Sequence, residues 1–214
     1  MVSTLRKERD RQRRERTRQA LLRAAQRVFV RKGYHKTLVS DIVAAAGVGQ
    51  GTFYRSFRDK RHILQTLLEE FLSELLAEFS EMEKHLPADA AEYRKASIEA
   101  FLRAAQVVGD NRRLCLFLLR EAVTVDDRMA ELVGQMYDRF AKRAQFYLDH
   151  AIARGFARPC RTDLVAQAIV GMALRTAELW LKGRFANVSI DQIVVELVDF
   201  AFEGFAPSGG ADTP

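Results

Sequence analysis

The sequence predicts an all-α protein of about nine helices. Apolar residues make up 48% of the 214 positions, and they recur at the three- and four-residue spacing of helices. No stretch alternates apolar and polar residues as a half-buried strand would. Proline, which interrupts helices, occurs only four times. Periodicity and the scarcity of helix breakers therefore indicate the fold class, and the apolar content is sufficient for a core.

The chain divides into a basic and an acidic part. Residues 1–61 contain 17 Lys and Arg against 5 Asp and Glu, a net charge of +12. Residues 62–214 contain 17 against 23, a net charge of −6. A strongly basic segment attracts a polyanion, which the acidic remainder would repel. The charge distribution predicts that the first part binds nucleic acid; a solvated arm without a partner explains only residues 1–15.

Two helices are predicted at the start of the basic part. The first covers residues 16–32, with apolar residues along one face, and Gly33 ends it. Thr37 can cap the second, whose first turn contains Asp41, an acidic residue suited to the positive end of the helix dipole. This second helix ends at Ala46.

A tight turn and a third helix follow, and together they have the form of a major-groove binding element. Gly47 and Val48 form the turn, and the third helix begins near Gln50. The major groove admits one helix, while the preceding helix braces it across the backbone. Ile42, Val48 and Phe53 are the expected core. The residues left for the outside of the third helix are Gln50, Gly51, Thr52, Tyr54, Arg55 and Ser56.

The remaining helices form a second, larger part. Asp59 caps a long fourth helix, which ends before Pro87. Five further helices are expected near 89–108, 111–122, 127–154, 162–183 and 190–205. The predicted organisation is a flexible basic arm at 1–15, a DNA-binding domain at 16–60, a regulatory and dimerisation domain at 61–206 and a loose tail at 207–214.

The segment from Gly33 to Leu64, GYHKTLVSDIVAAAGVGQGTFYRSFRDKRHIL, resembles the TetR family of transcriptional regulators. It follows the family pattern G-[YF]-x-x-T-x-V-x-D-I-A-x-x-A-G-V-S-x-G-T-[LF]-Y-x-x-F-x-x-K-x-x-L, in which about fifteen spaced positions agree together. The resemblance covers roughly residues 16–65. Leu38, Val43 and Gly49 depart from the pattern; glycine is still an acceptable helix cap.

The resemblance implies DNA-contacting roles for individual residues. Tyr54 and Lys60 would hold phosphates, with Thr37 and Thr52 helping, and Gln50, Gly51 and Arg55 would face base edges, to which Gln and Arg pair well. Other interpretations stay open. Tyr54 could pack against the fourth helix, Thr37 could be a cap alone, Lys60 could be solvated, and Arg55 could bind phosphate. The arm between Arg6 and Arg18 could follow the backbone, enter the minor groove or remain in solvent.

The resemblance also implies a ligand pocket in the helical C-terminal domain and a homodimer formed by the last two helices. The helices at 162–183 and 190–205 are apolar on more than one face, which independently favours a second copy as a partner. A two-fold dimer suits a palindromic operator on double-stranded DNA. The predicted pocket residues are Phe101, Phe117, Arg120, Tyr137, Phe140, Tyr147, Met172 and Arg175.

Two of these pocket candidates are arginines with apolar neighbours in sequence, where a buried charge needs a partner. Arg175 could pair with Glu178, and Arg120 with Glu121 or Asp126. Alternatively, one of them could hold the carboxylate or phosphate of an amphipathic inducer.

No catalytic constellation, metal site or cofactor site is expected. The four histidines are scattered, the two cysteines have no metal-ligand spacing, and there is neither a nucleophile elbow nor a phosphate-binding glycine loop. No uninterrupted apolar stretch is expected to cross a bilayer, and a cytoplasmic location is predicted. The sequence thus favours a ligand-responsive, sequence-specific transcriptional regulator, most simply a repressor released by a small apolar or amphipathic effector. An activator and a DNA-binding structural protein are the alternatives.

Overall fold

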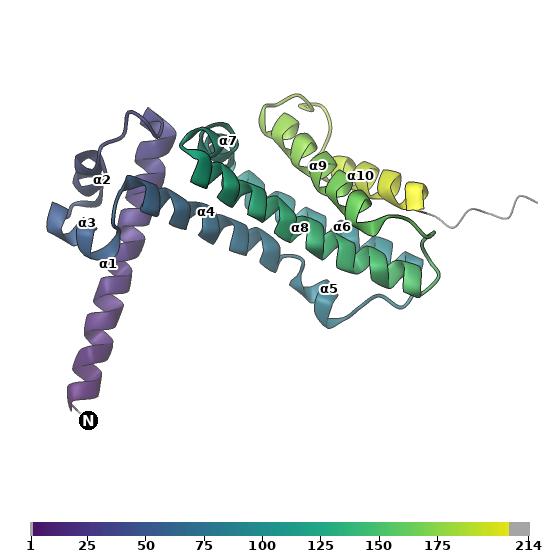
Figure 1. Ribbon diagram of the computed structural model, residues 1–214, viewed down its shortest axis with the longest axis horizontal. Coiled ribbons are helices and arrows are strands. Elements are labelled where there is room, and N and C mark those ends of the chain that lie inside the picture. Colours follow the sequence, from purple (N-terminus) through teal and green to yellow (C-terminus); the bar gives the residue numbers. More distant parts are fainter. Residues whose placement is uncertain (1, 206–214) are drawn as a thin grey trace, which may run out of the picture. The chain divides into compact units, whose positions relative to one another are not determined.

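The computed structural model describes residues 2–205, and within them it contains helices and turns but no strand (Figure 1). The predicted all-α class is confirmed. The α-helices are α1 (Val2–Lys32), α2 (Val39–Ala46), α3 (Gln50–Ser56), α4 (Lys60–Ala77), α5 (Ser80–Lys84), α6 (Ala90–Asp110), α7 (Arg112–Glu121), α8 (Asp127–Ala153), α9 (Thr162–Leu181) and α10 (Ile190–Phe205). A 3₁₀ turn, η1, covers Ala122–Thr124.

The predicted long fourth helix is two helices, α4 and α5. At the break the backbone bonds tighten to three-residue spacing, at Glu78 and Phe79. The carbonyl of Glu78 accepts a hydrogen bond from Arg103 at 3.0 Å, and that of Phe79 accepts one from the Tyr147 hydroxyl at 2.8 Å. Carbonyls at a helix end need such partners, and here they come from α6 and α8. The sequence pattern gave no sign of these distant donors, so the break was missed.

The first helix is longer than predicted. It begins at Val2 instead of near Arg16, so the expected flexible arm is helical over the part that the structure describes. It ends where predicted, at Gly33, whose φ of 79° belongs to the left-handed region that favours glycine. The predicted loose tail at 207–214 lies outside the described residues.

The chain forms two compact units. The first contains residues up to 71 together with 117–129, and the second contains 72–116 together with the residues from 130 onward. These bounds differ from the expected division at residue 60, since a segment from the middle of the chain returns to the first unit.

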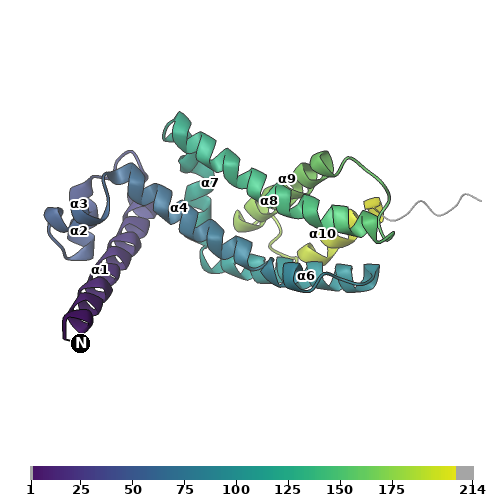
Figure 2. The same cartoon turned by 60° about the horizontal axis from the view of Figure 1, so that its bottom comes forward.

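In the first unit, α1 packs against α2, and α2 against α3 (Figure 2). Ile42 of α2 and Phe53 of α3 are fully buried, as predicted, whereas Val48 in the turn is only partly buried. Leu22 and Phe29 on α1 complete this core. Helices of seven and eight residues are too short to be stable alone, so this packing provides most of their stability.

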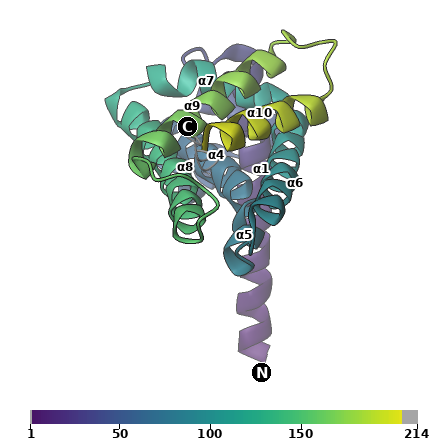
Figure 3. The ribbon, with the colours of Figure 1, turned by 90° about the vertical axis from the view of Figure 1, so that its right-hand side faces the viewer.

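In the second unit, α6 packs against α9 and α10, and the latter two lie together beside α6 and α8 (Figure 3). One buried cluster contains Met82, Ala100 and Tyr147. Arg94 of α6 makes a two-pronged ion pair with Asp199 of α10, with N–O distances of 2.5 and 2.9 Å. The hydrogen bond from Arg94 keeps the pKa of the Asp199 carboxyl below its usual value.

One helix of the described chain, α9, is long and apolar enough to cross a membrane by length and composition. Arg175 and Glu178 interrupt its apolar run, so the expectation that no uninterrupted apolar stretch would span a bilayer is not contradicted. Only 11% of its most apolar 18-residue window is buried within the chain. Most of its apolar side chains are partly buried, whereas Leu164 is exposed.

Candidate nucleic-acid interface

A left-handed glycine sets the joint between α2 and α3. Gly47 has a φ of 67°, and its N–H donates to Ala44 at 3.2 Å. The next N–H, that of Val48, reaches back to the carbonyl of Val43 at 3.1 Å. These two bonds satisfy the last carbonyls of α2 and turn the chain sharply, as in a Schellman motif. The turn predicted from Gly47 and Val48 is confirmed.

One side of α3 faces solvent and the other enters the core. Gln50, Gly51, Tyr54 and Arg55 are exposed, whereas Phe53 between them is fully buried. Tyr54 is 57% exposed and makes a T-shaped ring contact with Phe53, so most of its surface is open to solvent. The exposed side carries an amide, a phenol and a guanidinium, which can donate to phosphates and base edges.

The hydroxyl residues of α3 lie partly buried beside this exposed side. Thr52 Oγ1 accepts a hydrogen bond from Arg55 Nη2 at 2.9 Å, and its own proton stays available to an acceptor. Ser56 Oγ lies 3.5 Å from the carbonyl of Thr52, at the limit for a hydrogen bond. Gly49 has extended backbone angles at the start of α3 and caps the helix without a side-chain bond, as predicted.

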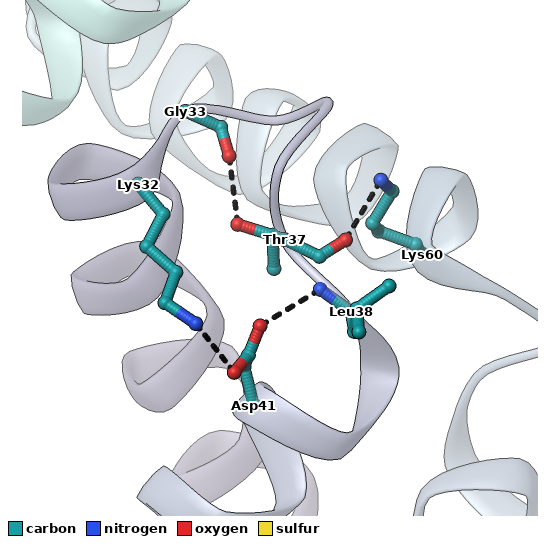
Figure 4. A network of polar contacts seen from close by, with 6 residues as sticks. All are labelled: Lys32, Gly33, Thr37, Leu38, Asp41 and Lys60. Atoms are coloured by element: carbon teal, nitrogen blue, oxygen red, sulfur yellow. Dashed lines mark hydrogen bonds and ion pairs between the residues drawn. The ribbon is translucent and has the colours of Figure 1, made fainter.

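Thr37 belongs to the loop between α1 and α2 and is not the predicted helix cap. Its side chain is 0% exposed, and its hydroxyl donates back to the carbonyl of Gly33 at 2.7 Å (Figure 4). The residue before α2 is instead Leu38. A hydroxyl buried in this way cannot reach a phosphate, so the predicted DNA contact of the Thr37 side chain is wrong for this conformation.

Lys60, expected to bind phosphate or remain in solvent, is directed to the same loop. Its ammonium donates to the carbonyls of Tyr34 and Thr37 at 2.8 Å each and lies 3.4 Å from that of His35. It also sits over the Tyr34 ring, 4.3 Å from the centroid. Partial burial lowers its pKa. The three N–H donors of the Lys60 ammonium are thus directed at three backbone carbonyls of the loop between α1 and α2, and Lys60 stabilises the conformation of this loop.

Asp41 connects the start of α2 to the end of α1. Its carboxylate accepts hydrogen bonds from Lys32 Nζ at 2.5 Å and from the N–H of Leu38 at 2.9 Å (Figure 4). The Lys32 bond first, and the Leu38 bond second, lower the pKa of the carboxyl below its usual value. The prediction of an acidic residue favourable to the first turn is confirmed, with a specific ion pair that spacing did not reveal.

The returning segment 117–129 supports this loop from within the first unit. Glu121 accepts a hydrogen bond from the N–H of Tyr34 at 2.6 Å. Asp126 pairs with Arg61 at 3.2 Å, and Phe117 stacks on Phe29 with centroids 5.8 Å apart. Sequence reasoning missed these contacts because their partners lie 65 to 88 residues apart, beyond any local pattern.

Three of the predicted pocket residues have other surroundings. Phe117 belongs to the core of the first unit. Arg120 is exposed, and the acids proposed as its partners bind elsewhere. Arg175 is also exposed and pairs with Glu178 at 2.5 Å, as the simpler of its two interpretations predicted. The expectation that these arginines lie among apolar side chains is therefore wrong.

The other predicted pocket residues lie in the second unit. Phe101, Tyr137, Phe140 and Met172 are partly buried, and Tyr147 is buried. Phe101 packs edge-on against Phe79 with centroids 5.3 Å apart. Burial raises the pKa of Tyr137. Their role as a pocket lining stays a prediction.

No group of three or more His, Cys, Asp or Glu side chains suitable for a metal ion occurs in the part of the chain that the structure describes. An α2 that packs through Ile42 and Val43, a tight glycine turn and an α3 with a polar exposed side together define a helix-turn-helix element. The chain therefore falls in the class of helix-turn-helix DNA-binding proteins.

Comparison with known proteins identifies the domain that contains this element. The profile of the bacterial regulatory proteins of the tetR family matches residues 21–67, which include this element. The fatty acid metabolism regulator protein of Bacillus subtilis (strain 168) is 24% identical over 181 residues, covering 83% of this chain and 91% of its own. Residues 21–67 therefore carry a tetR-family DNA-binding domain, and the relatives that align with most of the chain are transcriptional regulators.

Solved structures share the whole fold. A TetR-family regulator from Syntrophomonas wolfei str. Goettingen superposes with a TM-score of 0.73 at 22% identity, covering 92% of this chain and 99% of its own. The regulator FadR from Bacillus subtilis, in complex with stearoyl-CoA, superposes with a TM-score of 0.72 at 19% identity, covering 87% and 98%. At these identities the likeness establishes the fold alone.

Proposed function

We propose that the chain is a homodimeric repressor in the cytoplasm, which binds a palindromic operator and is released by an amphipathic effector such as a fatty acyl thioester. The observation that carries the DNA-binding part is the exposed side of α3, where Gln50, Tyr54 and Arg55 surround Gly51 above a buried Phe53. Gly51 has no side chain, so the backbone of α3 can approach the major groove closely, whereas the Gln and Arg side chains can pair bidentately with adenine and guanine.

The uncovered apolar faces of α9 and α10 support the dimer. Leu164 of α9 is 64% exposed and Phe200 of α10 is 69% exposed, so both helices present apolar side chains to solvent. A second copy of the same two helices would cover them in a two-fold interface. The dimer would bring two α3 helices to a palindrome, with half-sites one helical turn or a multiple apart.

The dimer is tested with Phe200→Asp, measured by light scattering after size exclusion. We expect a monomer, since a carboxylate in an apolar interface has no partner. Phe146→Asp, on α8, is the matched control because that ring is also solvent-exposed at 47%, and it should leave the dimer intact. A dimer that survives Phe200→Asp, or is lost equally in both variants, contradicts the proposed interface.

The effector class is supported by similarity. The related Bacillus subtilis protein regulates fatty acid metabolism, and a structural neighbour was solved with stearoyl-CoA. The predicted pocket residues that remain, Phe101, Tyr137, Phe140, Tyr147 and Met172, are aromatic or apolar and suit an acyl chain. Release is then a population shift: an effector that favours the conformer with lower DNA affinity reduces binding by the coupling energy, about 1–3 kcal/mol.

The deciding experiment is selection from randomised duplex DNA, followed by effector titration on the selected site. A palindrome enriched from the pool, and released by stearoyl-CoA but not by coenzyme A or stearate alone, is the expected result. Binding without any enriched sequence would refute sequence-specific regulation. An enriched palindrome unaffected by stearoyl-CoA would keep the regulator and reject this effector class.

A further inference from the structure

The first helix continues well beyond the rest of the first unit. Its side chains from Leu5 to Arg16 are all exposed, and its N-terminal part projects away from α2 and α3 (Figures 1 and 2). At 1.5 Å per residue, the 15 residues from Val2 to Arg16 extend about 22 Å. The side chains of residues 5–16 are thus not packed into the first unit. Residues 2–16 contain 7 of the chain's 34 Lys and Arg residues, together with three acidic residues.

One face of α1 changes from apolar to basic where the helix leaves the core. Positions 22, 25 and 29 on this face are buried apolar residues. Arg18 follows at the edge, with its guanidinium 4.9 Å from the centre of the Phe57 ring at the end of α3. Beyond it, at the same three- and four-residue spacing, stand Arg14, Arg11 and Lys7. These three residues, named the basic row, therefore continue the face of α1 on which Arg18 contacts the end of α3.

The helical form decides how such a row can bind DNA. An α-helix with side chains is about 10–12 Å wide, whereas the minor groove is only about 6 Å wide. A basic arm can enter that groove when extended, but not as a helix. Long arginine and lysine side chains along a helix can instead reach phosphates of the adjoining backbone, where they displace counterions.

We propose that the basic row, Lys7, Arg11 and Arg14, binds backbone phosphates of DNA that flanks the operator half-site. This inference rests on the proposed DNA-binding function and extends its footprint. Lys7, the outermost residue of the row, lies nine residues beyond Arg16, or about 14 Å along the helix, which corresponds to about four base pairs at 3.4 Å per pair. The row supplies affinity without selecting a sequence, since phosphates are the same at every step.

The test compares the variant Lys7→Gln/Arg11→Gln/Arg14→Gln with the wild-type dimer on the selected operator, with and without about eight flanking base pairs on each side. On the flanked operator we expect at least a tenfold loss of affinity and a fall of at least two in the slope of log K against log salt, since each phosphate contact contributes about 0.9. On the unflanked operator the two proteins should bind within about threefold.

The control is a variant with the same charge change on the other side of the helix, Arg6→Gln/Arg9→Gln/Arg13→Gln. It should change affinity for the flanked operator less than about threefold, and circular dichroism should report equal helix content in both variants. Equal losses from the two rows would indicate general attraction by a solvated helix and overturn the proposal, as would no loss from either. Wild-type protein that enriches no operator would instead refute the proposed function itself.

Discussion

Replacing Lys60 by Met tests whether this residue organises the loop or binds DNA. Methionine keeps most of the aliphatic stem and removes the ammonium that donates at 2.8 Å to the carbonyls of Tyr34 and Thr37. Hydrogen bonds from a charged donor contribute about 1.5–3 kcal/mol each. Lys60 is only partly buried, so water would replace part of this, and we expect a total loss of about 2 kcal/mol.

The assay is thermal unfolding of the full chain together with operator titrations at several salt concentrations. A loss of about 2 kcal/mol lowers the Tm by about 4–8 °C in a chain of this length. Affinity for the operator should fall because the loop that leads into α2 loosens. The slope of log K against log salt should change by less than one phosphate contact, about 0.9.

Lys36→Met is the matched control. Lys36 lies in the same loop, is exposed, and loses the same charge on substitution. We expect its Tm to stay within about 2 °C of wild type, since surface substitutions change stability by about 0.5 kcal/mol or less. If Lys60→Met kept the wild-type Tm while its salt slope fell by about 0.9 per subunit, Lys60 would be a phosphate ligand and the structural role argued for it would be wrong.

Two further substitutions probe the contacts of this loop, and a third probes an ion pair in the second unit. Thr37→Val should lower the free energy of unfolding by about 1–2 kcal/mol, measured by urea denaturation, because a buried hydroxyl bond is lost; an unchanged midpoint would contradict this. Glu121→Ala should speed hydrogen exchange at the Tyr34 amide, which donates a hydrogen bond to the Glu121 carboxylate at 2.6 Å. Exchange as slow as in the wild type would show that Glu121 does not stabilise this loop. Asp199→Asn should lower the Tm at neutral pH: the folded pKa of Asp199 is depressed by Arg94, so its contribution is present above the unfolded pKa of 3.8 and is lost as the pH falls through the folded pKa. The gap between variant and wild type should therefore close in acid, and a gap that persists would refute the linkage.

The helix-turn-helix element could be predicted in detail because its determinants are local. Gly33 and Gly47 occupy the left-handed positions that their sequence context required. The Asp59 carboxylate accepts from the N–H of His62 at 2.7 Å, as expected of a helix cap. Ile42 and Phe53 are buried where the helical spacing placed them. Each of these signals involves residues a few positions apart, which is the range over which a single sequence is informative.

The roles of polar residues with distant partners could not be predicted. Lys60 fits the expected motif position, but its carbonyl partners are 23 to 26 residues earlier in the chain. Glu121 and Asp126 were the two alternative partners of Arg120, whereas Glu121 accepts from Tyr34 and Asp126 pairs with Arg61. Arg175 could be paired correctly because Glu178 is one helical turn away. Tertiary hydrogen bonds depend on how the chain folds, so the spacing of residues along the sequence does not predict them.

The return of residues 117–129 to the first unit has a practical consequence for transplanting this DNA-binding module. A fragment cut at the end of the sequence motif, or even at residue 71, would expose the Phe29 ring that Phe117 covers and would leave the Tyr34 amide without Glu121. In a chimera that exchanges only the first third of the chain, Phe29 and Tyr34 would face residues of the other protein in place of Phe117 and Glu121. A functional graft would have to exchange two separate stretches together, so the module is contiguous in space but not in the gene.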